Sequence, residues 1–160
     1  MEKLHPGFKW SRRIGAIFAT IFIAVWLSLF IGGASKSIGA GIGAFFTILI
    51  LGILFNELII GLAYANWKYQ FTDDVFKMEH GIIFKTYKSI PYARIQNIDI
   101  RRGILARILG YSTVLLQTAG YSAWGRHPGA HMAEGYLPAV SVAKAEHIRD
   151  MIMKKISKRK

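Results

Sequence analysis

Two adjacent apolar runs constrain this chain more than any other feature of its sequence. Residues 14–35 contain no Lys, Arg, Asp or Glu, and after Lys36 the same is true of residues 37–56. A membrane-spanning helix needs about 20 apolar residues, because each residue advances about 1.5 Å across a hydrocarbon core of about 30 Å. Covering two such helices would take a far larger soluble protein. We therefore expect a transmembrane hairpin within residues 14–65, with helices at about 14–35 and 38–62.

A cleaved signal peptide is the alternative interpretation of the first run. Arg12 and Arg13 would form its basic end, and the small residues 32–34 would form its cleavage site. The apolar part of a signal peptide is only about 7–15 residues long, however. The first run is longer than this, and a second run follows it at once, so the sequence favours two membrane helices.

Basic residues predict the orientation of the hairpin. The chain has a net charge of +12, although 52% of its residues are hydrophobic. Four basic residues precede the first span, at positions 3, 9, 12 and 13, whereas the connecting loop holds only Lys36. Because Lys and Arg accumulate on the cytoplasmic side of a membrane, we expect a multi-pass protein of the cell membrane. Residues 1–13 would form a cytoplasmic N-terminal segment, and both termini would be cytoplasmic.

The remainder of the chain has the pattern of a small β domain. Apolar and polar residues alternate at 67–72 and 76–79, which is typical of half-buried strands. Further strands are expected at 82–90, 95–101, 113–118 and 136–140, followed by an amphipathic helix from Val142. We expect residues 66–156 to form an antiparallel β barrel of the pleckstrin-homology type with a C-terminal helix. Residues 157–160 would be a basic tail.

Several segments of this domain resemble a known family. They are Tyr69–Asp74, Glu79–Ile83, Ile90–Ile98, Leu109–Tyr111 and Gln117–Gly120. Together they are similar to the bacterial pleckstrin-homology family often labelled YdbS-like. That family joins two N-terminal membrane helices to one such domain, and the resemblance covers about residues 64–156 and the hairpin. It implies the fold and the membrane topology. Loop 121–135 departs from the family, so no function tied to it is carried over.

Two features of the hairpin are candidate sites. Gly39 and Gly43 form a G-x-x-x-G pattern, which allows two membrane helices to approach closely. The same stretch matches a nucleotide-binding string, but no strand precedes it, so helix packing is the better interpretation. Glu57 is an acid near the end of the second span. Acids inside membranes are often functional, so Glu57 is a possible intramembrane polar site.

Catalytic chemistry has little support in the sequence. The chain has no cysteine and nine acidic residues, and we expect no catalytic residue, metal or cofactor. Ser122 lies in a segment that resembles a nucleophile elbow but has one residue too many. His127 and His131 have the spacing of metal ligands on a helix, but the Gly and Pro residues around them argue against a helix there. A membrane enzyme that uses loop 121–135 is the least favoured hypothesis.

The basic side chains of the domain are the strongest signal for binding. The 16 basic and 7 acidic residues of positions 67–160 give that region +9 of the total charge. Basic residues attract the anionic face of a membrane, whereas nucleic acid is disfavoured because the domain is tethered and has no recognition motif. The candidate contacts for a ligand or anionic lipid are Arg94, Arg101, Arg102, Arg107, Lys154 and Lys155.

These observations lead to a functional hypothesis. We expect a non-enzymatic, membrane-anchored binding or scaffolding module at the cytoplasmic face. Its ligand would be a protein partner or a second copy of the chain, because domains of this type offer an exposed sheet edge and loops. The alternative is that the basic surface senses anionic lipid headgroups.

Overall fold

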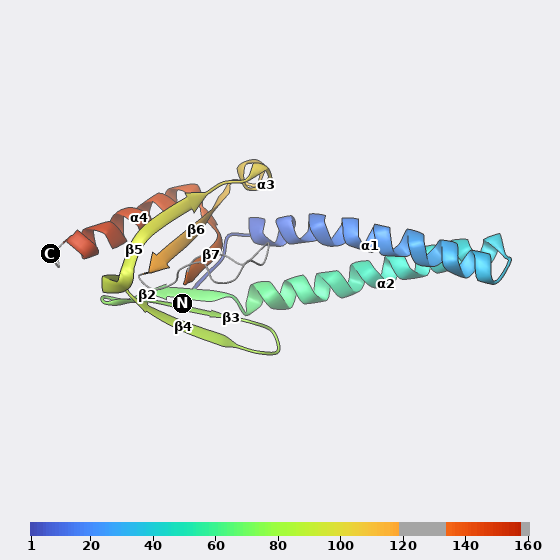
Figure 1. The fold of residues 1–160 in the computed structure, drawn as a ribbon, viewed down its shortest axis with the longest axis horizontal. Helices are drawn as coiled ribbons and strands as arrows, with labels where there is room; N and C mark the ends of the chain where they lie inside the picture. Colours follow the sequence, from blue (N-terminus) through green and yellow to red (C-terminus); the bar gives the residue numbers. More distant parts are fainter. Residues whose placement is uncertain (119–133, 158–160) are drawn as a thin grey trace. The chain divides into compact units, whose positions relative to one another are not determined.

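The computed structural model describes residues 1–118 and 134–157, which form two compact units (Figure 1). One unit, residues Lys9–Leu62, contains most of a helical hairpin. The other unit contains Met1–Phe8 together with the chain from Ala63 onward, and we call it the domain. The N-terminal residues are therefore part of the domain, although the hairpin separates them from it in sequence.

The hairpin consists of α1 (Gly7–Ala34) and α2 (Ile38–Ala65). Both helices are long and apolar enough to cross a membrane, as the uncharged runs predict. Each has 28 residues and is therefore about 42 Å long, which exceeds a hydrocarbon core of about 30 Å. The two helices thus extend beyond the predicted spans at the ends that join the domain, where α1 carries Lys9, Arg12 and Arg13.

The first sheet of the domain has four antiparallel strands in the order β1-β2-β3-β4. They are β1 (Glu2–Lys3), β2 (Lys68–Phe71), β3 (Val75–His80) and β4 (Thr86–Pro91). After β4, a short 3₁₀ helix, η1 (Tyr92–Arg94), leads into the second sheet. Pro91 precedes this helix because its fixed φ and missing N–H suit the end of a strand.

The second sheet has three antiparallel strands in the order β5-β6-β7. They are β5 (Ile95–Arg101), β6 (Tyr111–Thr118) and β7 (Gly135–Ser141), and the short helix α3 (Ile104–Ile108) lies between β5 and β6. β7 tolerates Pro138 because it is at the edge of this sheet. A bulge occurs there, and the Thr113 hydroxyl donates a hydrogen bond of 2.9 Å to the Pro138 carbonyl.

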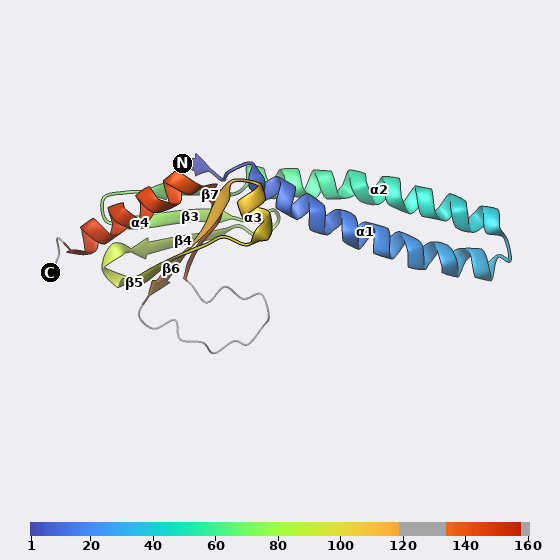
Figure 2. The ribbon, with the colours of Figure 1, turned by 90° about the horizontal axis from the view of Figure 1, so that it is seen from above.

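The C-terminal helix α4 (Val142–Ser157) packs on the second sheet (Figures 1 and 2). Its buried side chains are Ala145, Ile148 and Ile152, which share one face because helical neighbours are three or four residues apart. They join one hydrophobic core with inward-facing residues of both sheets, including Tyr69, Phe76, Ile90, Val114, Leu116 and Leu137. Two sheets and a terminal helix are the fold that the sequence predicts.

The N-terminal residues complete the domain in a way that the sequence did not reveal. β1 pairs with β2, and the backbone N–H of His5 donates to the carbonyl of Ala139 in β7. The Tyr64 hydroxyl donates a 2.9 Å hydrogen bond to the Leu4 carbonyl. Leu4 and Phe8 are buried in the core. Residues 1–8 thus contact both sheets and the last turn of α2.

One local expectation was wrong. The third strand was expected at residues 82–90, but β4 begins at Thr86. Gly81 has a φ of +119°, and a Cβ there would lie 1.9 Å from the Phe84 carbonyl oxygen, so the chain turns sharply over residues 81–85. Trp67, the first residue of the alternating segment 67–72, is buried in the domain core and stacks on His80 at 5.4 Å.

Candidate binding surfaces

The six basic candidates lie at opposite ends of the domain. Arg94 precedes the first residue of β5, whereas Arg101 is its last residue. A strand of seven residues is about 23 Å long. Arg102 and Arg107 accompany Arg101 near α3, while Lys154 and Lys155 lie in the last turns of α4. The six therefore form two separate basic groups rather than one site.

The group around α3 contains exposed and bonded arginines. Arg101 is exposed, and its guanidinium is 4.0 Å from Asp99. Arg107 is also exposed, and no ion pair or hydrogen bond of its side chain is found among the described residues. Arg102 differs, because its Nε donates a 2.7 Å hydrogen bond to the buried Ser112 hydroxyl and its guanidinium is 3.5 Å from Glu146. Arg101 and Arg107 are thus the accessible charges of this group.

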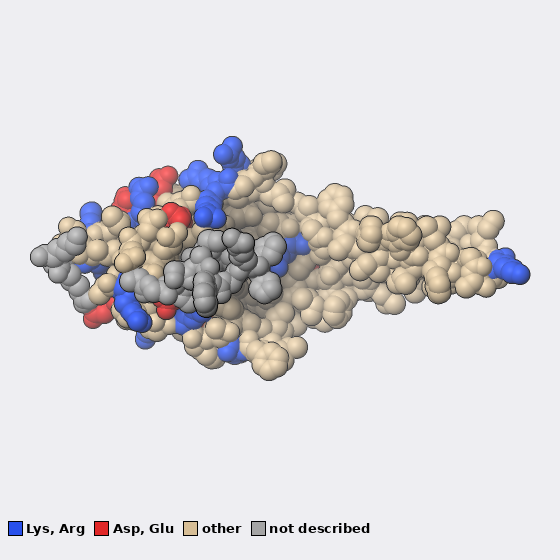
Figure 3. Space-filling model, in the orientation of Figure 1, with Lys and Arg blue, Asp and Glu red and all other residues tan. Residues whose placement is uncertain are grey.

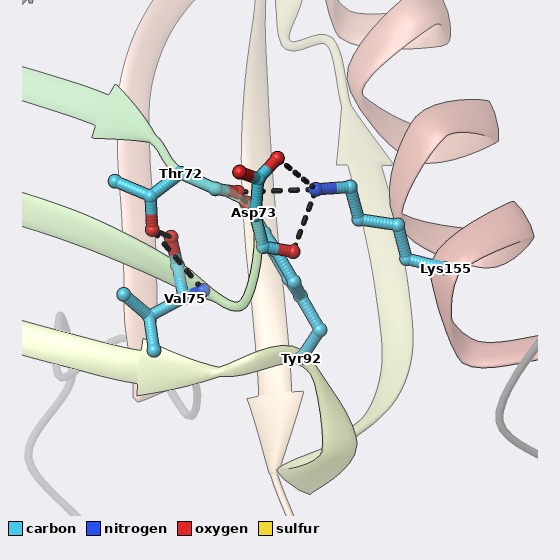
Figure 4. A network of polar contacts seen from close by, with 5 residues as sticks. All are labelled: Thr72, Asp73, Val75, Tyr92 and Lys155. Atoms are coloured by element: carbon cyan, nitrogen blue, oxygen red, sulfur yellow. Dashed lines mark hydrogen bonds and ion pairs between the residues drawn. The ribbon is translucent and has the colours of Figure 1, made fainter.

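At the other end, Lys155 holds α4 to the turn between β2 and β3 (Figure 4). Its ammonium donates to the carbonyl oxygens of Thr72 at 3.1 Å and Asp73 at 2.7 Å, and lies 3.8 Å from the Asp73 carboxylate. It also lies 5.0 Å from the centre of the Tyr92 ring. These contacts give Lys155 a structural role inside the domain. Its contact with an external ligand stays a prediction.

Tyr92 strengthens the same corner of the domain. Its hydroxyl donates a 2.9 Å hydrogen bond to the Thr72 carbonyl, and its backbone N–H donates to the Asp74 carbonyl. Burial, with the nearby carboxylates of Asp73 and Asp74, raises the pKa of the Tyr92 hydroxyl. Asp73 and Asp74 therefore belong to a turn, while Arg94 and Lys154 remain exposed beside it.

Strand β4 forms an open edge of the first sheet. It pairs with β3 on one side, and no strand among residues 1–118 and 134–157 pairs with its other side. Thr86, Tyr87 and Ser89 are exposed. A shallow hollow lies over this part of the sheet and is lined in part by Lys68, Lys77, Tyr87 and Ser89. An unpaired edge of this kind can accept another extended chain.

A histidine with a shifted pKa immediately precedes the turn between β3 and β4. His80 is the last residue of β3, and its ring stacks on Trp67. Burial and then the positive charge of Lys88 lower the pKa of His80. The Lys88 ammonium in turn donates to the Glu134 carbonyl at 3.1 Å. The imidazole is therefore favoured in its neutral form.

Within the hairpin, Glu57 pairs with Arg13 across the two helices. The Glu57 carboxylate accepts from the Arg13 guanidinium, with a closest distance of 2.6 Å. Two turns further along α1, the Asn56 amide donates a 2.7 Å hydrogen bond to the Thr20 hydroxyl. Because an unpaired acid in a membrane is costly, these contacts give Glu57 a role in aligning the helices. Its functional role stays a prediction.

Other glycines than the predicted pair lie against the facing helix in the hairpin. A Cβ on Gly41 would lie 3.1 Å from the Ser28 carbonyl oxygen and 3.2 Å from the Gly32 Cα. A Cβ on Gly43 would meet no described atom within 4 Å, and one on Gly39 would meet only the Ser37 side chain. Gly32 and Gly41 therefore form one close contact within the hairpin, and Gly52 forms another, because a Cβ there would lie 2.5 Å from Cγ2 of Thr20. Helix packing through Gly39 and Gly43 stays a prediction.

The candidate catalytic residues Ser122, His127 and His131 lie outside the described residues. Glu134, which follows them, is described, and its carboxylate accepts a hydrogen bond from the buried Thr118 hydroxyl. Over the described residues, no group of three His, Asp or Glu side chains is arranged to hold a metal ion. The hypothesis of an enzyme based on loop 121–135 is untested.

These features define a class of protein: an antiparallel domain with a terminal helix, joined to two helices that are suited to cross a membrane. The chain matches the family described as "Bacterial PH domain" over residues 13–156, and it belongs to that family. The resemblance seen in the sequence is thereby confirmed.

A curated relative agrees with this assignment. The chain is 29% identical over 118 residues to the "UPF0699 transmembrane protein YdbT" of Bacillus subtilis (strain 168). The match covers 72% of this chain but only 22% of the relative, so the chain spans about a fifth of the length of that protein. No solved structure shows a significant match to this chain.

Proposed function

We propose that this protein is a non-enzymatic, membrane-anchored binding module that recruits a protein partner at the cytoplasmic face. The observation that carries the proposal is the open, exposed edge of β4. A partner would add an extended segment to this edge, and its main-chain hydrogen bonds would supply the affinity. The hairpin would hold the edge close to the membrane and raise its effective concentration for a partner in the same membrane.

The register of β3 and β4 identifies the backbone groups that are available. Val75 lies opposite Pro91, and the Tyr92 N–H donates to the Asp74 carbonyl. In an antiparallel pair, this bond makes Val75 and Pro91 a non-hydrogen-bonded pair, and bonded and non-bonded pairs then alternate. The N–H and C=O groups of Tyr87 and Ser89 consequently point away from β3. They are the groups that a new strand would meet.

The surface beside the edge suggests the chemistry of the partner. Lys68 and Lys77 line the hollow near Tyr87, and the acid on this face, Glu79, lies 3.5 Å from Lys85. This local excess of positive charge complements acidic side chains. We therefore propose an extended segment with acidic residues as the protein ligand.

A photo-crosslinking amino acid at position 87 of the full chain, in native membranes, tests the proposal. We expect a protein adduct that is recovered reproducibly and is absent when the crosslinker replaces Lys154, which is exposed at the other end of the domain. Ser89→Pro removes an outward N–H without breaking a bond to β3, so it should abolish the adduct while the domain stays folded. An adduct that persists in Ser89→Pro would contradict strand addition.

The identity of the adduct distinguishes two forms of the proposal. A different protein supports recruitment, whereas a second copy of this chain supports self-assembly through paired β4 edges. If position 87 gives no protein adduct beyond that of the Lys154 control, the binding-module proposal is wrong. The experiment needs the full chain, because Leu4 and Phe8 belong to the domain core.

The second candidate function is sensing of anionic lipid, which the exposure of Arg101 and Arg107 favours. Each basic residue near an anionic surface contributes about 1 kcal/mol, and salt weakens the attraction. Full-length protein in nanodiscs should show hydrogen-exchange protection of residues 101–109 that increases with phosphatidylglycerol and decreases with salt. Protection that changes with neither phosphatidylglycerol nor salt would exclude charge-based sensing.

A further inference from the structure

Four large apolar side chains stand out on the surface of the domain. Among its described residues, Ile83, Phe84, Ile104 and Ile108 are each more than 70% exposed, and Phe84 reaches 87%. They occur as two pairs, one in the turn after β3 and one on α3. Isolated exposed apolar residues are ordinary, but grouped ones mark interaction surfaces.

Contacts inside the domain place both pairs at one end. The chain leaves the domain for the hairpin after Phe8 and returns at Ala63. Trp67, four residues after the return, stacks on His80, which immediately precedes the turn that bears Ile83 and Phe84. The first pair therefore borders the point at which the chain re-enters the domain.

The contact between Gly7 and Tyr111 places α3 at the same end of the domain. A Cβ on Gly7 would lie 2.5 Å from Cδ1 of Tyr111, so the backbone at Gly7 lies against that ring. Tyr111 begins β6, three residues after Ile108. The second pair thus borders the point at which the chain leaves the domain. Figures 1 and 2 both show α3 and the turn after β3 at the same end of the domain.

Charge distinguishes this end from an ordinary protein-binding patch. Residues 81–86 and 101–110 contain four basic residues and no acidic one. Acids outside these two segments pair with Lys85, Arg101 and Arg102, whereas no ion pair of Arg107 is found among the described residues. Figure 3 shows the blue Lys and Arg side chains gathered over the domain, while most of the helical surface is uncharged. Apolar side chains interleaved with basic ones are typical of elements that lie in the membrane interface, where lipid tails and anionic headgroups meet.

We infer that the turn at Ile83–Phe84 and the helix α3 insert their apolar side chains into the interfacial layer of the bilayer, with Arg101 and Arg107 at headgroup level. The inserted surface would fix the orientation of the domain on the membrane and direct β4 toward a partner. The inference does not depend on the β4 ligand. It deepens the lipid-sensing candidate by adding an apolar contact that does not need anionic lipid.

The absence of cysteine from the chain allows a direct test. Single variants Phe84→Cys and Ile108→Cys, each with a nitroxide label, are reconstituted at one chain per nanodisc. Arg94→Cys and Lys154→Cys serve as matched controls at the other end of the domain, and Ser89→Cys shows whether the label inserts by itself. Collision of the label with oxygen, which dissolves in lipid, is compared with its collision with a water-soluble nickel chelate.

We expect labels at positions 84 and 108 to collide mainly with oxygen, and the three controls mainly with nickel. Replacing Ile83 and Phe84 with Ser should then shift the label at position 108 toward water. In zwitterionic nanodiscs the labels should remain protected from nickel. This result would support apolar insertion even without anionic lipid. If anionic lipid had no effect on the domain, only the proposal of charge-based sensing would be wrong.

Two results would overturn the inference. Nickel access at positions 84 and 108 equal to that of the controls would mean that this end of the domain faces water. Protection from both oxygen and nickel would mean that the labels are packed against protein. The protein that covers the labels could be a second copy of this chain. In that case the spectrum should broaden with several chains per disc, and the broadening should disappear on dilution with unlabelled protein.

Discussion

At the scale of single residues, Lys154 and Lys155 show that neighbouring basic residues can have different roles. Both are basic, adjacent and near the end of α4, so the sequence treats them alike. In the structure, Lys155 reaches the turn at Thr72 and Asp73, whereas Lys154 is exposed. A motif of basic residues therefore predicts charge, but not which charge is already used inside the protein.

Lys155→Met should destabilise the domain, because the carbonyl oxygens of Thr72 and Asp73 lose a charged donor. Lys155 is about one-third exposed (32%), so water replaces part of the loss. We expect the free energy of unfolding to fall by about 1–2 kcal/mol. Urea unfolding of the full chain, followed by Trp67 fluorescence in a background without other tryptophans, would measure this change. The matched variant Lys154→Met should change stability by about 0.5 kcal/mol or less.

His80 should make the stability of the domain depend on pH. Its pKa is lowered in the folded state, first by burial and then by Lys88, from an ordinary value of 6.5. As the pH falls below that value, the unfolded state binds a proton that the folded state resists, so stability decreases until the pH passes below the folded-state pKa. Tyr69 cannot cause this change, because burial raises its pKa far above neutral pH.

Thermal unfolding between about pH 7 and pH 5 would reveal this contribution. His80→Phe keeps a ring against Trp67 but cannot bind a proton, so its melting temperature should fall less over this range than that of the unchanged protein. The Lys144 ammonium lowers the pKa of Glu2, so Glu2 loses its charge only at lower pH and does not contribute to the change between about pH 7 and pH 5. Equal slopes for the two proteins would show that His80 makes no contribution.

At the scale of elements, long periodic segments were predictable and short ones were not. The hairpin, the strands around Tyr69, Phe76 and Val114, and the final helix all follow from apolar runs or periodicity in the sequence. β1 has only two residues, so it carries no period, and its strand character comes from pairing with β2. Leu4 and Phe8, two apolar residues in a mostly polar segment, were the signal that could have indicated that residues 1–8 join the core.

The candidate sites were less predictable than the fold for a similar reason. Their members are defined by neighbours distant in sequence, such as Asp73 for Lys155 and Arg13 for Glu57. The open edge of β4 depends on strand order, which no local pattern contains. The sequence identified Glu57 and the arginines as unusual residues, but only the fold separates Arg107, which is accessible, from Arg102, which is bonded.

The hairpin contact supplies a prediction at the scale of elements. Gly41→Leu should separate the helices, because even a Cβ at Gly41 approaches Ser28 and Gly32 closely. Overpacking of this kind costs about 1–3 kcal/mol. A Cβ at Gly43, two residues away, would meet no described atom within 4 Å, so Gly43→Leu should leave the hairpin intact. Loss of circular dichroism at 222 nm during heating in detergent compares the two. Equal melting temperatures would contradict the Gly32–Gly41 contact.

At the scale of the whole molecule, the N-terminal residues connect topology with folding. β1 pairs with β2, and Leu4 and Phe8 lie in the same core as α4. The domain therefore needs residues that precede the hairpin as well as residues that follow it. Both ends of the hairpin must then face the same side of the membrane, which requires an even number of spans. The pairing of β1 with β2 thus supports a two-span topology independently of hydropathy.

This topology can be tested with single cysteines and a membrane-impermeant maleimide in intact cells. Lys3→Cys lies in β1, Arg94→Cys lies in the domain, and Lys36→Cys lies between the two spans; all three positions are exposed. Because basic residues favour the cytoplasm, we expect Lys36→Cys to react from outside. The other two should react only after the membrane is opened. Outside labelling of Lys3→Cys but not of Arg94→Cys would place them on opposite sides, which is incompatible with the pairing of β1 and β2. Outside labelling of both, with Lys36→Cys protected, would keep the fold but reverse its orientation, and would move the proposed partner to the other face of the membrane.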